Sequence, residues 1–239
     1  MKQFQGLGWA AIFDTIEHPS RCRYTKGMLR RRLLVSYKIF FGLLGFSALV
    51  SEIAVLAERG KFEPTNFFSF FTVQTNSLVC LVFLLSALLT TPKPPRWLST
   101  LRAAATVYIL IVGIGFAALL SGLEGVALTA VPWDNIVLHY IIPVAVLLDY
   151  LFDRPTLAAG LGRKLWWLVF PIAYAAYSLI RGAATGWYPY PFLNPSANGY
   201  AGLVLPIAGL VVLGVILVWG VDSLSKRPVP STAKRPGKR

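Results

Sequence analysis

Six long apolar runs divide this chain and restrict what it can fold into. They lie at about residues 33–57, 67–90, 102–122, 135–152, 165–182 and 201–221. Each is close to the ~20 residues that an α-helix needs to cross the hydrocarbon core of a bilayer. The runs are continuous rather than alternating in ten-residue segments, which favours helices over a transmembrane β-barrel. The sequence therefore predicts an all-α, polytopic membrane protein with six transmembrane helices.

The composition agrees with this class and excludes others. Of the 239 residues, 56% are hydrophobic and 14% are charged, whereas ordinary soluble domains carry about 25% charged residues. The formal net charge of +13 would suggest nucleic-acid binding in a soluble protein. Here the basic residues lie in tails and short connections, where they set topology, so no nucleic-acid partner is expected. Cys22 and Cys80 are too few for a zinc cage and are placed in dissimilar surroundings, so no disulfide, metal or cofactor is expected.

The basic residues also predict the orientation. Nineteen of the 23 lie in the N-terminal tail, the second and fourth connections and the C-terminal tail. The other side holds Arg59, Lys61 and Arg181, and Lys38 lies inside the first run. The positive-inside rule then predicts cytoplasmic termini and extracytoplasmic first, third and fifth connections. We expect a multi-pass protein of the plasma membrane, in a bacterial cell.

The chain is expected to form one membrane domain with two flanking segments. Residues 33–221 hold the six helices, and residues 1–32 form a basic N-terminal segment on the cytoplasmic side. Within that segment the apolar patch 7–13 is compatible with a short interfacial helix or with a solvated tail. Residues 222–239 are Pro-rich and basic and are predicted to be a disordered tail near anionic headgroups.

Polar side chains gather in the predicted outer half of three runs. Helical spacing of three and four residues puts them on shared faces: Thr72, Thr75 and Asn76; Asn135 and His139; Tyr174, Tyr177, Ser178 and Arg181. At 1.5 Å per residue, Thr72 lies about 8 to 9 Å below the outer surface and His139 about 6 Å below Asn135. The inner halves of the same runs are predicted to be largely Leu, Val and Ala. The three polar faces should therefore meet in the outer leaflet.

Two interpretations compete for this polar set. Thr, Asn and His side chains often join membrane helices through hydrogen bonds worth ~0.6 kcal/mol each, and Trp187, Tyr188 and Tyr190 are typical of an aromatic interface belt. Ionisable residues in a membrane span, however, usually mark function, because they are costly there: Asp, Lys and Arg cost on the order of 2.5 to 3.5 kcal/mol at the helix centre on insertion scales. The concentration of the set in one leaflet, around the intramembrane His139, favours a site.

The residue types in this set suit acyl transfer. Histidine acts as a general base near neutral pH and activates a hydroxyl within hydrogen-bond reach. His139 and Thr72 supply these two groups. Oxyanion donors are available from several side chains: Gln74, Asn76, Asn135 and Arg181. Thr75 and Tyr177 are further supporting candidates, and the role of Asp134, five residues before His139, stays open.

Three stretches together resemble a known family. They are residues 66–76, residues 138–143 and the Gly-Trp-Tyr-Pro-Tyr-Pro-Phe-Leu stretch at 186–193. They are similar to those of bacterial six-span relatives of the androgen-induced family of multipass membrane proteins, in order and spacing along all six helices. Eukaryotic members hydrolyse fatty acid esters of hydroxy fatty acids with an intramembrane threonine and a histidine. The resemblance implies a Thr72 and His139 pair, acting on membrane lipids or lipid-like esters.

Alternatives remain open on this basis. The spacing from Thr72 to Asn76 is one residue longer than in the family pattern, which keeps Thr75 as a second candidate nucleophile. The alternative function is a non-enzymatic lipid-binding or small-molecule transport protein that uses the same polar cavity. No sequence pattern assigns an oligomeric state.

Overall fold

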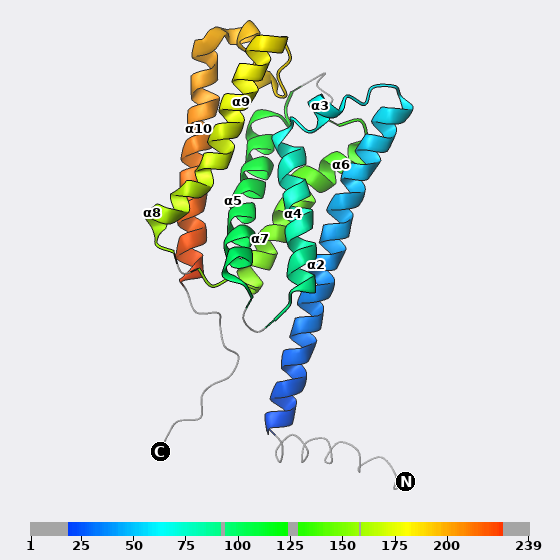
Figure 1. The fold of residues 1–239 in the computed structure, drawn as a ribbon, viewed down its shortest axis with the longest axis vertical. Coiled ribbons are helices and arrows are strands. Elements are labelled where there is room, and N and C mark those ends of the chain that lie inside the picture. The colour runs from blue at the N-terminus through cyan, green and yellow to red at the C-terminus, as the bar shows by residue number, and fades with distance from the viewer. Residues whose placement is uncertain (1–18, 92–93, 124–128, 158, 227–239) are drawn as a thin grey trace, which may run out of the picture.

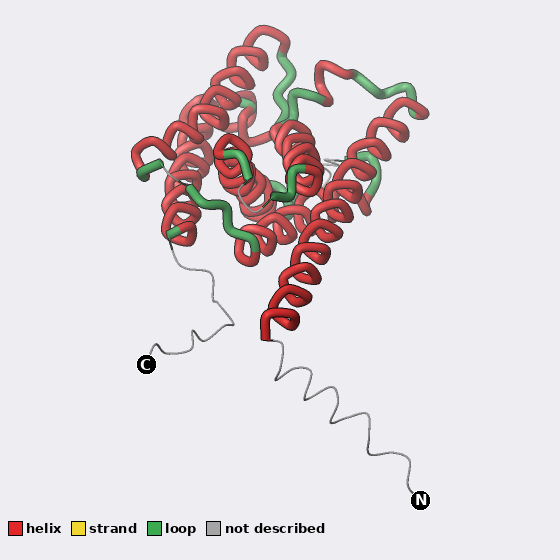
Figure 2. The backbone as a smooth tube through the Cα atoms, turned by 60° about the horizontal axis from the view of Figure 1, so that its bottom comes forward, coloured by secondary structure: helices red, strands yellow, loops and turns green. Residues whose placement is uncertain are grey.

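The computed structural model describes residues 19–91, 94–123, 129–157 and 159–226, and all regular structure in these ranges is helical (Figures 1 and 2). Six helical segments are long and apolar enough to cross a membrane: Gly27–Glu58, Phe71–Leu88, Arg96–Leu119, Pro132–Phe152, Leu161–Thr185 and Gly199–Ser225. The predicted all-α class with six membrane-spanning helices is confirmed. The protein is an integral membrane protein.

The first and last helices are longer than their apolar runs. Helix α2 covers Pro19–Glu58 and α10 covers Pro195–Ser225, so part of the basic N-terminal segment and the start of the predicted tail are helical. The apolar patch at residues 7–13 and the tail from residue 227 onward lie outside the described residues.

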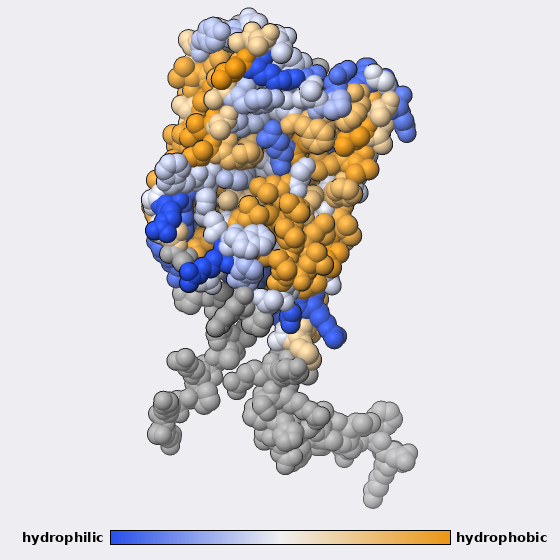
Figure 3. Space-filling model, viewed as in Figure 1, coloured by the Kyte–Doolittle hydropathy of each residue, from blue (hydrophilic) through white to orange (hydrophobic). Residues whose placement is uncertain are grey.

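Helices α4 (Phe71–Leu88) and α5 (Arg96–Leu119) form the centre of the bundle. In each, 61% of the residues in the most apolar 18-residue stretch are buried, compared with 28% in α2 and 17% in α10. Helix α2 packs along α4, and α10 packs on the opposite side against α5 (Figure 1). The exposed faces of the outer helices are largely apolar, as Figure 3 shows over α2 and α4, with hydrophilic residues nearer the ends. Such a surface suits contact with lipid chains.

Helix starts and stops at one end of the bundle follow from proline and glycine. Pro64 and Pro191 occupy the first position of the short helices α3 (Pro64–Phe67) and η3 (Pro191–Leu193), where a missing N–H costs nothing. Helix α9 (Val169–Thr185) ends at Gly186, whose φ of +73° is a left-handed conformation that favours glycine. The loop after Gly186 turns back toward the start of α4.

The fourth span is interrupted by a π-turn. It consists of α6 (Pro132–Ile136), the π-helical turn η1 (Val137–Ile141) and α7 (Ile142–Phe152). Pro143 has no N–H, so the His139 carbonyl lacks its usual intrahelical donor, and a wider turn forms just before it. On α5, Gly113 permits close packing here, because an added Cβ would lie 2.9 Å from Pro143 Cβ. The π-turn therefore packs directly on α5 at the level of His139.

Charged side chains are buried at the other end of the bundle. Lys38 and Arg102 contact Asp149 at 3.0 and 2.7 Å, and both also contact Asp153, at 2.5 and 3.1 Å. Burial would raise the pKa of Asp153, but the positive charges of Arg102 and Lys38 outweigh it and hold that pKa below its ordinary value.

A second buried ion pair joins Lys164, at the end of α8 (Leu161–Lys164), to Asp222 of α10, which also binds Lys226. The apolar composition expected for the inner halves of the second, fourth and fifth runs gives no sign of these buried charges. Each buried charge is compensated by a partner from a helix distant in sequence, or one turn away in the case of Lys226.

Candidate active site

Thr72 and His139 lie together in the half of the bundle where α4 begins. Thr72 is the second residue of α4 and His139 is the middle residue of the π-turn. Thr72 Oγ1 lies 3.2 Å from His139 Nε2. The two residues are only 8% and 4% exposed, so the contact is shielded from solvent.

The direction of this hydrogen bond follows from the other side of the imidazole. His139 Nδ1 lies 3.1 Å from the backbone carbonyl oxygen of Asn135. A carbonyl only accepts, so Nδ1 carries the proton, and Nε2 of the neutral ring is an acceptor. Thr72 therefore donates its hydroxyl proton to His139. This is the tautomer that a general base for the Thr72 hydroxyl requires.

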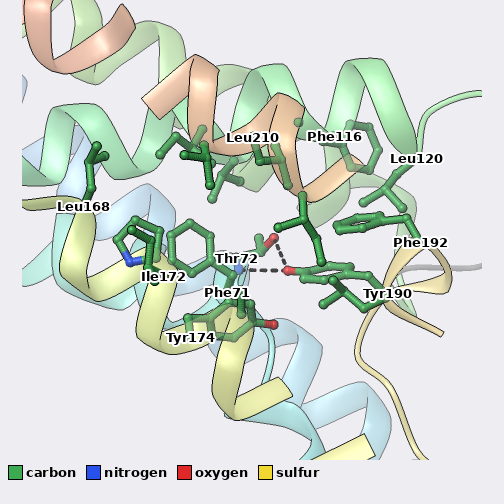
Figure 4. A pocket seen from close by; sticks show the side chains of 18 residues that line it. Phe71, Thr72, Phe116, Leu120, Leu168, Ile172, Tyr174, Tyr190, Phe192 and Leu210 are labelled. Atoms are coloured by element: carbon green, nitrogen blue, oxygen red, sulfur yellow. Dashed lines mark hydrogen bonds between the residues drawn. The ribbon is translucent and has the colours of Figure 1, made fainter. Parts of the chain in front are cut away.

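Tyr190 completes the arrangement from the loop between α9 and α10. Its hydroxyl oxygen accepts a hydrogen bond from the Thr72 backbone N–H at 3.1 Å and lies 3.2 Å from Thr72 Oγ1 (Figure 4). Because the Thr72 proton is directed at His139, the Tyr190 hydroxyl is the donor to Oγ1. Burial raises the pKa of Tyr190, so the phenol keeps this proton. The chain of donors runs from Tyr190 through Thr72 to His139 and ends at the Asn135 carbonyl.

An aromatic ring fixes the plane of the imidazole. Phe116 of α5 stacks on His139 with a centroid distance of 4.0 Å and an interplanar angle of 26°. With one ring face covered and Nδ1 bonded within its own helix, His139 has little rotational freedom. Its Nε2 therefore stays directed at Thr72.

Two cavities meet at Thr72 and Tyr190. One, of about 150 Å³, lies among α4, α5, α9 and α10 and is lined mainly by apolar residues, among them Phe71, Phe116, Leu168, Ile207 and Leu210 (Figure 4). The other, of about 400 Å³, also includes His139 and is bordered by polar residues, among them Glu52, Arg59, Lys61, Asn66 and Thr129. Thr72 and Tyr190 line both cavities. A molecule with an apolar and a polar part would bring its junction to Thr72.

Two other predicted residues of α4 are buried close to Thr72. Asn76 is fully buried and donates from Nδ2 to the carbonyls of Thr72 and Leu138, at 2.9 and 3.3 Å. It thereby joins α4 to the π-turn. Thr75 is also fully buried, and its hydroxyl has no partner among the described residues. The hydrogen bond to His139 distinguishes Thr72 from Thr75.

The remaining predicted residues point elsewhere. The side chains of Gln74 and Arg181 bind the α3 region, at the Phe68 carbonyl (2.8 Å) and Asn66 Oδ1 (2.7 Å). Tyr177 is 45% exposed and contacts Ser69 Oγ at 2.9 Å.

Asn135 and Asp134 take different parts in the fourth span. Asn135 reaches His139 through its backbone carbonyl, not its side chain. Asp134 is fully buried and faces Glu52, so it does not orient the imidazole.

Tyr190 and Phe116 are the site residues that sequence reasoning missed. The sequence assigns Tyr190 to an aromatic interface belt, since a tyrosine beside prolines and a tryptophan near a helix end is typical of one. Its position in the 186–193 stretch, one of the three that carry the family resemblance, is the available signal. Phe116, in a uniformly apolar run, gives no signal, because stacking on histidine depends on helix packing.

The fold and site define a class: an integral membrane protein of six spans with a buried Thr, His and Tyr constellation between two cavities. In the described part of the chain, no three His, Cys, Asp or Glu side chains are grouped so that they could hold a metal ion. The chain matches no protein-family model, no curated protein and no solved structure. The function must therefore be argued from the site.

Proposed function

We propose that this protein is an intramembrane lipid ester hydrolase in which Thr72 is the nucleophile and His139 the general base. The observation that carries the proposal is the hydrogen bond from the Thr72 hydroxyl to His139 Nε2, formed where an apolar and a polar cavity meet. A hydroxyl bonded to a correctly oriented neutral imidazole is the arrangement that recurs in serine and threonine hydrolases on unrelated folds.

The reaction would proceed in two halves. Thr72 Oγ1 attacks the ester carbonyl carbon while its proton moves to His139 Nε2. The tetrahedral intermediate collapses, and the leaving alcohol takes that proton. Water, deprotonated by His139, then attacks the threonyl ester. The carboxylic acid is released, and His139 returns the proton to Thr72 Oγ1, which restores both residues. Tyr190 is suited to donate to the developing oxyanion, because its hydroxyl already donates to Thr72 Oγ1.

The two cavities support a lipid-like ester as the substrate. The apolar cavity suits an acyl chain, and the polar cavity suits the more hydrophilic part of the molecule. The resemblance to the androgen-induced family supports the same substrate class. With the positive-inside rule, it also supports a site in the outer leaflet of the plasma membrane, with both termini in the cytoplasm.

A lipid-binding or small-molecule transport protein is the alternative, favoured by the size of the polar cavity. Such a protein needs the cavities but not a nucleophile. The two proposals therefore differ in whether the Thr72 hydroxyl reacts.

The test removes one hydroxyl at a time. Thr72→Val and Thr75→Val each replace a buried threonine by a residue of similar shape on the same helix. We expect purified wild-type protein and Thr75→Val to hydrolyse fluorogenic fatty acid esters and to be labelled by a hydroxyl-directed fluorophosphonate. Thr72→Val should lose both properties, and His139→Ala should lower the rate by about 10²-fold or more.

Other results would redirect the proposal. Loss of activity in Thr75→Val alone would move the nucleophile to Thr75. A wild-type protein that binds fatty acid esters without cleaving them or reacting with the probe would favour the binding or transport function.

A further inference from the structure

A third cavity lies at the end of the bundle opposite Thr72. It has a volume of about 340 Å³ and is enclosed by the start of α2, the end of α4, the start of α5 and the segment after α7. This volume falls within the range of about 300 to 1,000 Å³ that is usual for small-molecule sites. None of the residues that line this cavity takes part in the proposed hydrolysis.

The lining of this cavity is strongly basic. Arg30 and Arg31 lie at its outer rim, and Lys38 and Arg102 lie deeper, at 4% and 9% exposure. The carboxylates of Asp149 and Asp153 pair with Lys38 and Arg102. The four basic side chains exceed the two carboxylates by two positive charges. Arg154 is a further basic residue in the lining.

The two rim arginines are held by backbone carbonyls, and Arg30 also interacts electrostatically with Asp153. Arg30 donates to the carbonyl of Phe152 at 2.6 Å, and Arg31 donates to the carbonyl of Thr90. Neither forms an ion pair within the described ranges. Each guanidinium has further N–H groups that these carbonyls do not use. The rim is therefore fixed in position and still able to bind an anion.

A buried donor points to the same ligand chemistry. Arg102 Nε is buried and has no hydrogen-bond partner among the described residues, although the other end of the guanidinium binds Asp149 and Asp153. Buried polar groups are rarely left unsatisfied in proteins. Thr91 and Thr156 add hydroxyl groups around the cavity, whereas the Thr90 hydroxyl already donates to backbone carbonyls of α4. Arginine pairs and hydroxyls are the groups that recognise phosphate oxygens.

We propose that this cavity binds a phosphate group. Its position at the end of the membrane-spanning helices, where α2 continues beyond the apolar region, is at headgroup level. The phosphate is supplied by the headgroup of an anionic phospholipid or by a soluble phosphate, and both present the same oxygens to Arg30 and Arg31. Clusters of basic residues at a membrane surface bind anionic headgroups in this way.

The test compares two double variants of the full-length protein in a non-ionic detergent. Arg30→Gln with Arg31→Gln removes the rim charges. Arg32→Gln with Arg96→Gln removes two exposed charges at the same end that do not line the cavity. Binding of phosphatidylglycerol and of phosphatidylcholine with identical acyl chains is measured by native mass spectrometry and by the shift in melting temperature. Melting without lipid verifies that both variants are folded.

We expect the wild type to bind phosphatidylglycerol at least about tenfold more tightly than phosphatidylcholine. The rim variant should weaken this binding by about thirtyfold, as expected for two basic contacts, and the control variant by less than about threefold. Equal affinity for the two lipids, or equal losses in the two double variants, would overturn the proposal. So would a rim variant that binds like the wild type.

A second arm identifies the source of the phosphate. Inorganic phosphate is titrated in place of lipid, and then in competition with phosphatidylglycerol. Stabilisation of the wild type but not of the rim variant by phosphate without lipid assigns the site to a soluble ligand. Lipid binding that depends on the rim arginines and resists phosphate assigns it to a headgroup.

Discussion

Replacing Tyr190 by phenylalanine is the most informative single change in the active-site half of the protein. It removes one oxygen atom and keeps the ring, which stacks on Phe192 with a centroid distance of 5.3 Å. The lost hydroxyl accepts from the Thr72 N–H and contacts Thr72 Oγ1. Packing changes little, so the measured effect reports the hydroxyl.

The expected loss of stability follows from the position of Thr72 in α4. It is the second residue of the helix, so its N–H is one of the first four, which have no acceptor within a helix. Without Tyr190 that N–H is buried and unsatisfied, which costs about 1 to 3 kcal/mol. The Thr72 hydroxyl keeps its bond to His139, so little further cost is expected. The free energy of unfolding should therefore fall by about 1 to 3 kcal/mol.

The assay is equilibrium unfolding in mixed detergent micelles, with Tyr177→Phe as the matched control. Tyr177 is 45% exposed, and its hydroxyl contacts only Ser69 Oγ among the described residues. Its loss should cost less than about 0.5 kcal/mol, since Tyr177 is well exposed and Ser69 Oγ keeps its hydrogen bond to the Thr65 carbonyl. If Tyr190→Phe is no more destabilising than Tyr177→Phe, the claim that Tyr190 caps α4 is refuted.

The same variant tests the oxyanion role. If Tyr190 stabilises the developing charge, kcat for ester hydrolysis falls by about 10²-fold to 10³-fold, while Tyr177→Phe leaves it nearly unchanged. A variant with lowered stability but full activity at a temperature where it is folded would restrict Tyr190 to a structural role.

Three further predictions concern other parts of the molecule. In a cysteine-free background, Ser196→Cys should react with an impermeant thiol reagent in intact cells and Gly160→Cys should not; the reverse pattern would contradict the predicted orientation. Gly113→Ala should lower the unfolding free energy by about 1 to 3 kcal/mol, because its Cβ would collide with the π-turn. Gly209→Ala, which meets no atom within 4 Å, is its control and should be neutral or slightly stabilising. The difference in unfolding free energy between the wild type and Asp153→Asn should be constant above the ordinary pKa of Asp153, 3.8, and shrink as pH falls below that value. The reason is that a lowered folded-state pKa means that the ionised form stabilises the fold. A difference that is the same at pH 3 as at neutral pH would show that the ionised carboxylate does not stabilise the fold.

The helices could be predicted from the sequence because each apolar run is continuous and close to bilayer length. The pairing of Thr72 with His139 is also accessible, since residue counts put the two at similar depth in the second and fourth runs. Counting residues along one helix gives the depth of a side chain but not which neighbouring helix or loop it faces. Gln74 and Arg181 were at suitable depths, yet they bind the α3 region.

The buried charges show a second limit. The sequence gives Arg102 and Lys164 only as signals of topology, and Lys38 only as an isolated charge inside the first run. Their partners Asp149 and Asp222 come from other helices. Nothing in a single run indicates which carboxylate will neutralise which base, because that depends on how helices pack. The position of Tyr190 likewise depends on tertiary structure, because the loop between α9 and α10 brings its side chain into contact with Thr72 of α4.

The ion pair between Lys38 and Asp153 has a consequence for biosynthesis. Its partners are 115 residues apart, and at synthesis rates of about 5 to 20 residues per second, Lys38 precedes Asp153 by roughly 6 to 23 s. During that interval α2 has left the ribosome without its acidic partner. A lone lysine reaches for the interface with its flexible side chain rather than entering lipid. The ion pair between α2 and the end of the fourth span can therefore form only late in translation, after Asp153 has been made.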